Sequence, residues 1–271
     1  MIPIHDDNPT IRLPLVTIAL IVACVVTFLM VQPSATRSID APDSSELIAE
    51  VRFTYEYAAI PCEISQGRPL TIGEFGATQL RGNASACSPS PTGRPLFADK
   101  SIVLSVLVSM FLHGGWFHLI GNMIFLWVFG NNIEDHMGRF RYLAFYIAAG
   151  AVATFAHVVA DVDSTVPIIG ASGAIAGVMG AYLIWFPWAR VRTLFMIGII
   201  PLWPRVPAAL LLAVWFVTQF FTVPGSGVAW VAHVGGFAFG IVVAWTARRD
   251  PRFRRQLQSH RYRVTGHSPR R

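Results

Sequence analysis

Long apolar stretches that are almost free of charge alternate with short charged segments along this chain. Of its 271 residues, 54% are hydrophobic and 13% are charged, a composition too apolar for an ordinary soluble domain. A helix needs about 20 apolar residues to cross the hydrocarbon core of a bilayer. The sequence therefore predicts an all-α, polytopic membrane protein with six transmembrane helices, over residues 14–31, 102–129, 142–160, 172–186, 207–222 and 228–247, the second of which is interrupted at 113–118.

Arginines between the predicted spans indicate how the chain is oriented in the bilayer. The loops 130–141 and 187–206 carry five arginines, whereas the loops 161–169 and 223–229 carry no lysine or arginine. Because short loops rich in these residues stay in the cytoplasm, both termini are predicted to be cytoplasmic. The predicted order in the cell membrane is a cytoplasmic N-terminus (1–13), a first helix (14–31), an extracytoplasmic loop (32–101), a core of five helices (102–247) and a basic cytoplasmic tail (248–271).

The basic tail, two cysteines and the first apolar span each allow more than one interpretation. Nine arginines over 248–271 are better explained by orientation in the lipid bilayer than by nucleic acid, so no nucleic-acid partner is predicted. Cys62 and Cys87 share the 32–101 loop and could pair if that loop is extracytoplasmic. A cleaved signal peptide is the alternative for residues 14–31, although this span is long for one.

A few polar side chains lie inside the predicted spans, where they are costly and normally face the interior of a helix bundle. His118 and Asn122 are four residues apart and share one helix face, whereas His113 precedes His118 by five and points elsewhere. Ser172 and His233 each lie near the extracytoplasmic end of a predicted span. The polar groups are therefore expected to lie at a similar depth in the membrane. His157, late in the third span, is interpreted as structural.

The fourth span is short. Residues 172–186 make about 15 residues of helix, roughly 22 Å, which is less than the core they must cross. The backbone at 168–171 must then descend into the membrane without helical structure, which is tolerated only where it is buried or lines water. We therefore predict a recessed fourth helix and a water-accessible cavity with Ser172 at its floor.

Glycines on the fourth and sixth spans indicate close helix packing, at positions 173, 177 and 180 and at 236 and 240. These glycines could serve helix packing alone. They could also serve catalysis at the same time, because a close approach of the two backbones would bring the Ser172 hydroxyl within reach of the His233 imidazole.

These motifs together resemble the rhomboid family of intramembrane serine proteases. They are His113-x4-His118-x3-Asn122, Glu134-x3-Gly138, Gly170-Ala171-Ser172-Gly173 and His233-x2-Gly236-x3-Gly240. The resemblance implies a Ser172–His233 dyad and an oxyanion hole formed by Asn122, His118 and the Ser172 backbone N–H. It also implies cleavage of transmembrane or juxtamembrane segments of other membrane proteins, without a cofactor or metal. The remaining motif residues are expected to support the site: His113, Gly170, Gly173, Gly236 and Gly240.

The chain departs from the family pattern near the histidine. Ala176 occupies the position where members often carry a tyrosine that stacks under the histidine, and no acidic residue lies in a span at the depth of His233. We therefore expect a slow enzyme without a third triad member. Glu134 is expected to cap the inner loop against Gly138.

Two alternatives remain at this point. One is a catalytically inactive rhomboid-like protein that binds transmembrane clients. The other is a metal-dependent hydrolase or transporter that uses His113, His118 and His233, although the chain lacks an HExxH-type pair and a carboxylate at that depth.

Overall fold

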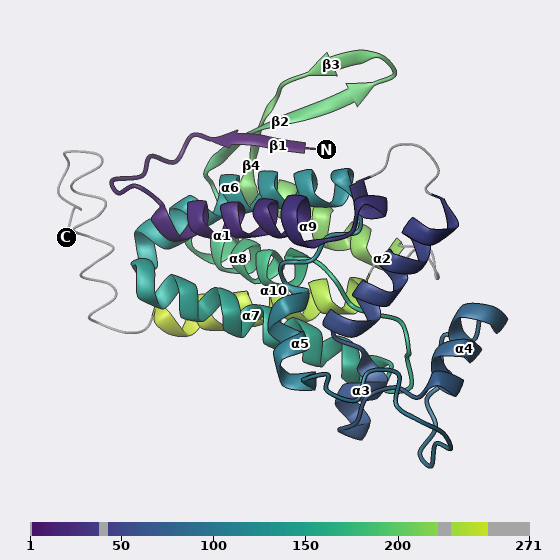
Figure 1. The fold of residues 1–271 in the computed structure, drawn as a ribbon. Helices are drawn as coiled ribbons and strands as arrows, with labels where there is room; N and C mark the ends of the chain where they lie inside the picture. Colours follow the sequence, from purple (N-terminus) through teal and green to yellow (C-terminus); the bar gives the residue numbers. More distant parts are fainter. Residues whose placement is uncertain (1, 38–42, 222–228, 249–271) are drawn as a thin grey trace.

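Most of the chain is helical in the computed structural model, which describes residues 2–37, 43–221 and 229–248. Most of the helices lie side by side in a bundle, and the helices within residues 44–81 gather at one end of it (Figure 1). The predicted tail at 248–271 lies outside the described residues except for Arg248. The bundle helices are α1 (Leu15–Val26, continued by a π-helical turn, Thr27–Val31), α5 (Ile102–Ser109), α6 (Trp116–Met137), α7 (Arg139–Ala160), α8 (Ser172–Trp185), α9 (Ala208–Thr218, continued by a 3₁₀ turn, Gln219–Phe221) and α10 (Trp230–Ala247).

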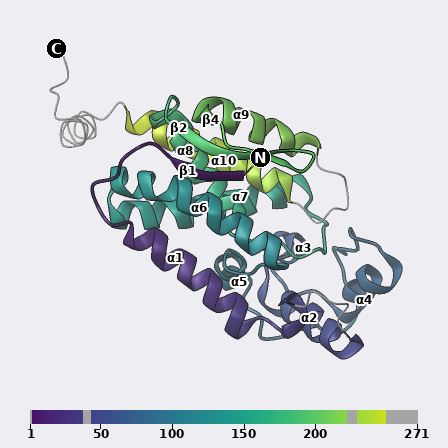
Figure 2. The ribbon, with the colours of Figure 1, turned by 90° about the horizontal axis from the view of Figure 1, so that it is seen from above.

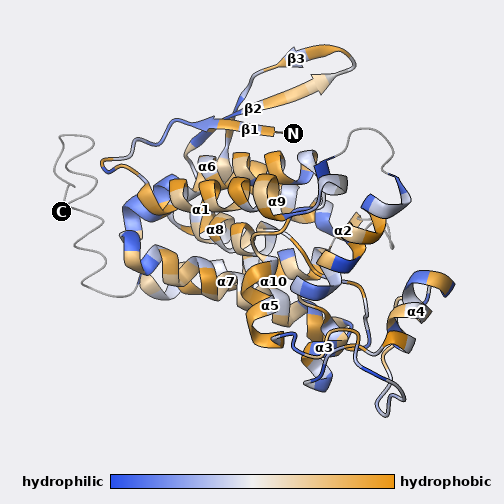
Figure 3. Cartoon of the chain, in the orientation of Figure 1, coloured by the Kyte–Doolittle hydropathy of each residue, from blue (hydrophilic) through white to orange (hydrophobic). Residues whose placement is uncertain are grey.

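Two of these helices, α7 and α10, are long and apolar enough to cross a membrane by length and composition. The helices α1, α8 and α9, counted with their end turns, are apolar but shorter. Many large apolar side chains on the outer faces are exposed, such as Phe155 at 63% and Val159 at 61% on α7. Figure 3 shows the apolar character of the bundle and the hydrophilic residues at its ends. Such a surface fits contact with lipid better than contact with water.

The interruption predicted at 113–118 within the helix over 102–129 is present, and it lies over residues 110–115. The structure divides the span into α5 and α6, and the six residues between them are not helical. Gly115 makes this break possible, because its φ of 144° is open to glycine and costly for other residues. After the break, α6 continues past residue 129 to Met137 and ends at Gly138, which also has a positive φ.

The prediction of an all-α fold missed a four-stranded sheet. It consists of β1 (Ile2–Asp6), β2 (Arg190–Ile197), β3 (Ile200–Leu202) and β4 (Arg205–Pro207), and β2 pairs antiparallel with each of the others. Ile2 pairs with Leu194. In Figure 2, β1 lies against the bundle near α6 and α8.

Asp6 attaches the sheet to the bundle. Its carboxylate accepts hydrogen bonds of 2.6 Å from the Asn132 amide of α6 and from the Tyr182 hydroxyl of α8. Asp6 is 3% exposed, and burial raises its pKa to about 6. The segment 1–13, expected to be a short polar terminus, is therefore partly built into the fold.

Glu134 of α6 caps the start of α1. The first amides of a helix lack partners within the helix, and Pro14 before α1 offers no side-chain cap. The Glu134 carboxylate accepts bonds from the Val16 N–H at 3.0 Å, the Thr17 N–H at 2.8 Å and the Thr17 hydroxyl at 2.8 Å. The expected contact with Gly138 exists only through the Glu134 backbone carbonyl, so the carboxylate joins two helices instead of closing the loop.

We expect Glu134→Ala to lower the free energy of unfolding by about 2–3 kcal/mol, because it leaves two amides and a buried hydroxyl without their acceptor. Thermal unfolding of the purified protein in detergent, followed by tryptophan fluorescence, measures this loss. The exposed Asp163 provides the control, since Asp163→Ala should leave the Tm unchanged. Equal Tm values for the two variants would contradict the capping role.

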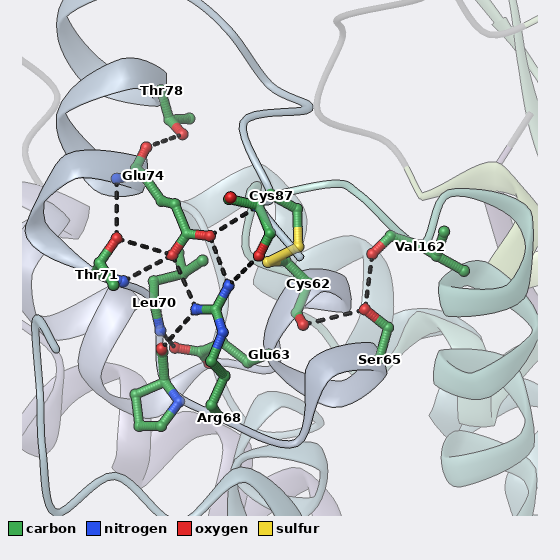
Figure 4. Close-up of polar contacts among 12 residues, drawn as sticks. Cys62, Glu63, Ser65, Arg68, Leu70, Thr71, Glu74, Thr78, Cys87 and Val162 are labelled. Carbon is green, nitrogen blue, oxygen red and sulfur yellow. Dashed lines mark hydrogen bonds and ion pairs between the residues drawn. A yellow bond between two sulfur atoms is a disulfide. The ribbon is translucent and has the colours of Figure 1, made fainter. Parts of the chain in front are cut away.

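The segment predicted as the 32–101 loop is folded. It contains α2 (Ser44–Tyr57), α3 (Pro61–Gln66) and α4 (Ile72–Arg81) around a small apolar core, and Cys62 and Cys87 form a disulfide. The pairing that the sequence left open is thus resolved. Figure 4 shows the polar cluster beside the disulfide, in which Arg68 and Glu74 form an ion pair of 2.7 Å. Burial acts to raise the pKa of Glu74, but hydrogen bonds from Arg68, Thr71 and Ser88 outweigh it and lower this pKa to about 2.

Candidate functional site

Ser172 is the first residue of α8 and follows a tight non-helical turn. Gly170 adopts φ +117°, and a Cβ at this position would lie 2.7 Å from the His118 Nε2 atom, so the turn requires glycine for two reasons. The Gly170 N–H donates to the Ser109 carbonyl at 2.9 Å, and the Ile168 N–H donates to the Ala59 carbonyl at 2.8 Å. The backbone before Ser172 is therefore held by the end of α5 and by the folded segment before α3.

Ser172 and His233 are joined by a hydrogen bond. The Ser172 Oγ and His233 Nε2 atoms are 2.8 Å apart, and both side chains are half-buried. His233 lies in the first turn of α10, which packs alongside α8. The two residues come from helices separated by α9 and the sheet strands in sequence, so only the tertiary fold brings them together.

Glycine contacts set the distance between α8 and α10. A Cβ at Gly236 would overlap the Gly173 carbonyl oxygen, and one at Gly240 would overlap the Gly177 carbonyl oxygen. From the other side, a Cβ at Gly180 would overlap the Phe237 carbonyl oxygen. The two backbones thus touch over several turns, as small residues on facing helices permit. This close approach lets the short serine side chain reach the imidazole.

A cavity of about 580 Å³ opens at the dyad, at the place predicted from the short fourth helix. Ser172, His233 and His118 contribute to its wall, together with the turn at Gly170 and small residues of α7 and α10. A volume of this size accommodates several residues of an extended peptide or a group of waters.

His118 and Asn122 lie on α6, and of these two residues His118 lines the cavity. Gly170 brings its backbone against the His118 ring, whereas the Asn122 side-chain nitrogen donates to the His118 carbonyl at 3.0 Å. Asn122 is 7% exposed, and its amide nitrogen carries a second N–H group. His113 is fully buried, and its ring contacts the His118 ring edge to face at 5.2 Å between centroids. His113 therefore packs against His118, although sequence spacing alone suggested that it points elsewhere.

The sequence interpretation missed the residue bound to the second nitrogen of His233. Gln219, in the 3₁₀ turn after α9, places its Oε1 atom 2.7 Å from the His233 Nδ1 atom. Trp215, one turn earlier, brings its ring to 6.0 Å from the imidazole centroid. A signal was present, because Gln219 is a polar residue inside the predicted span 207–222, and polar residues in spans are functional candidates. The nearest acids, Asp161 and Asp163, lie exposed beyond the end of α7.

Comparisons with known proteins agree with this arrangement. A family model described as the Rhomboid domain matches residues 100–250, more than half of the chain. The chain is 31% identical to the mitochondrial presenilin-associated rhomboid-like protein of Bos taurus over 151 residues, which are 53% of this chain and 38% of that protein. It is 27% identical to mitochondrial rhomboid protein 1 of Saccharomyces cerevisiae over 151 residues, 52% of this chain and 41% of the relative. These matches span about two-fifths of the relatives' length.

Proposed function

Since this chain belongs to the rhomboid family, we propose that it is an intramembrane serine endopeptidase that cleaves transmembrane or juxtamembrane segments of other membrane proteins. The observation that carries the proposal is the 2.8 Å contact between the Ser172 Oγ and His233 Nε2 atoms at the wall of a cavity. A serine hydroxyl is a weak nucleophile, and an adjacent general base is what activates it.

In this mechanism, Ser172 is the nucleophile and His233 is the acid–base catalyst. The His233 Nε2 atom takes the hydroxyl proton as Oγ attacks the peptide carbonyl, and then gives this proton to the leaving amine. Water from the cavity hydrolyses the resulting ester of Ser172, again with His233 as base. Because neutral His233 is required, activity is expected to be lost at acidic pH, where the imidazole becomes protonated.

The oxyanion of the tetrahedral intermediate is assigned to donors around the start of α8. The Ser172 N–H belongs to the first turn of a helix, where amides lack intrahelical partners and the helix dipole favours negative charge. His118 adjoins this turn, and Asn122 keeps one N–H group beyond its bond to the His118 carbonyl. Such donors are effective because they are held in place before the charge develops.

Asn122→Ala is expected to lower kcat about a hundredfold, the usual effect of removing one oxyanion donor, with KM and Tm close to those of the wild type. Steady-state cleavage of a transmembrane substrate in detergent gives kcat and KM. A near-normal kcat in this variant would remove Asn122 from the mechanism.

The proposed topology has six crossings by α1, α6, α7, α8, α9 and α10, with both termini cytoplasmic. Support comes from the two long apolar helices and from the arginines between the spans. The disulfide between Cys62 and Cys87 supports an extracytoplasmic site for the 32–101 segment, because disulfides persist in oxidising compartments. We propose the cell membrane as the location. The mitochondrial location in the names of the animal and yeast relatives describes those proteins.

One experiment tests the proposed function against its alternatives. Purified protein is incubated with a model transmembrane substrate as wild type, as Ser172→Ala and as wild type with EDTA. Cleavage that is lost only in Ser172→Ala supports the serine protease. Cleavage lost with EDTA would favour metal chemistry, and an absence of cleavage in every sample would favour an inactive client-binding protein. The contacts of His233 favour the first outcome, because Ser172 and Gln219 engage both of its ring nitrogens.

A further inference from the structure

We infer that Gln219 is the positioning residue of this site: its amide holds His233 in the one tautomer that can accept a proton from Ser172. The inference rests on the proposed function and adds to it a third residue, which supports the histidine in place of an acid. Its basis is a chain of three hydrogen bonds that runs from the backbone of α9 through Gln219 and His233 to Ser172.

The orientation of the Gln219 amide is set by the backbone of α9. Its Nε2 atom lies 2.9 Å from the carbonyl oxygen of Trp215. A carbonyl oxygen only accepts hydrogen bonds, so the NH₂ end of the amide must face Trp215 and the oxygen must face His233.

The Trp215 carbonyl is free for this contact because of how α9 ends. In a regular α-helix, the Gln219 N–H would bond to the Trp215 carbonyl. Here the chain tightens into the 3₁₀ turn Gln219–Phe221, and the Gln219 N–H bonds to the carbonyls of Phe216 and Val217 instead. The freed carbonyl then accepts from the side chains of Gln219 and Thr218. The local helix ending is therefore what orients the amide.

The amide in turn fixes the imidazole. Gln219 Oε1 can only accept, so the His233 Nδ1 atom, 2.7 Å away, must carry the proton. In neutral histidine, Nε2 then has no proton and offers its lone pair to the Ser172 hydroxyl at 2.8 Å. In Ser-His-Asp triads, a carboxylate holds the histidine in this tautomer. Here a neutral amide does so, which suits a site where a buried carboxylate would be costly.

Burial and packing keep this assembly in one geometry. Gln219 is 7% exposed, so its amide has little access to water and depends on its protein partners. The Trp215 ring, on the same face of α9, packs at an angle of 40° to the imidazole. Aromatic support for His233 thus comes from α9, whereas the family resemblance placed it on the fourth helix, at the position that is Ala176 here.

The test uses three variants of the full chain in detergent. Gln219→Met keeps the size of the side chain but offers no acceptor, and we expect kcat to fall at least about tenfold while KM stays the same. Gln219→Glu keeps an oxygen within reach of Nδ1, and its protonated carboxyl offers an O–H group to the Trp215 carbonyl in place of the NH₂ group, so it should restore a kcat well above that of Gln219→Met. Thr246→Val, which removes an exposed hydroxyl that donates to the Val242 and Val243 carbonyls of its own helix α10, serves as the control and should cleave at the wild-type rate.

A second measurement does not depend on binding of the transmembrane substrate. The rate at which Ser172 reacts with a small fluorophosphonate reports on the activated hydroxyl alone, and it should fall in Gln219→Met and recover in Gln219→Glu. Wild-type rates for Gln219→Met in both assays, or equal losses in the Met and Glu variants, would overturn the inference. Failure of the proposed function looks different, because wild-type protein would then neither cleave substrate nor acquire the label in a manner that depends on Ser172.

Discussion

Replacing Ser172 with alanine is expected to slow cleavage of a transmembrane substrate by at least about 10⁴-fold, down to the uncatalysed background of the assay. The hydroxyl is the only group at the wall of the cavity that lies within hydrogen-bonding distance of the His233 Nε2 atom in the described structure. His233→Ala should cost about as much. The double variant should be no slower than either single variant, because a nucleophile and its base act as one unit and their losses do not add.

Active-site titration with a fluorophosphonate, combined with single-turnover cleavage, measures these losses. Ser105→Ala is a suitable control, because Ser105 is a buried serine whose hydroxyl donates to the Ile102 carbonyl of its own helix. It should cleave at the wild-type rate. If His233→Ala retained the rate of the wild type, the hydrogen bond to Ser172 would be a packing contact without a role in proton transfer.

Gly240→Ala is expected to destabilise the protein by about 3 kcal/mol or more and to abolish activity in whatever fraction stays folded. The added methyl group would occupy the position of the Gly177 carbonyl oxygen, and backbone atoms have no rotamer by which to move aside. The helices α8 and α10 must therefore separate, and the separation would also stretch the contact between Ser172 and His233.

Gly121→Ala provides the matched control for this substitution. Gly121 also lies within a helix close to the site, but a Cβ there would meet nothing within 4 Å. Alanine is about 1 kcal/mol more favourable than glycine in a helix interior, so this variant should be at least as stable as the wild type. Thermal unfolding in detergent compares the two. Equal Tm values would mean that the glycine contacts between α8 and α10 do not set the helix spacing.

Hydropathy predicted the helices well because apolar length is a direct physical requirement for a membrane helix. The bounds of α8 and α10 differ from the predicted spans by one or two residues. The break between α5 and α6 was visible as two adjacent glycines, but only the backbone shows that Gly115 takes a positive φ. The sheet was missed because the 187–206 segment was interpreted only as a loop whose arginines orient the chain, although residues 190–197 are rich in strand-forming side chains.

The residues of the site were likewise predicted from the sequence only in part. Ser172 and His233 could be paired from sequence because both lie near the start of spans that enter the membrane from the same predicted side. Their depth in the membrane follows from their distance along the span, which can be counted in the sequence. Gln219 could not be found by searching for an acid, since holding a histidine tautomer requires an acceptor oxygen and not a charge. Its partner also depends on the 3₁₀ turn that ends α9, and sequence patterns locate the ends of helices poorly.

The pairing of β1 with β2 has a consequence for how the protein is made. Ile2 lies opposite Leu194, so β1 must wait for a partner strand that is synthesised much later. At about 5–20 residues per second, this delay is roughly 10–40 s. Asp6 also has to wait for Asn132 and Tyr182, its two donors, which follow it by more than a hundred residues. Docking of β1 is therefore a late event in biogenesis, which requires that α6, α8 and the strand after α8 have already been made.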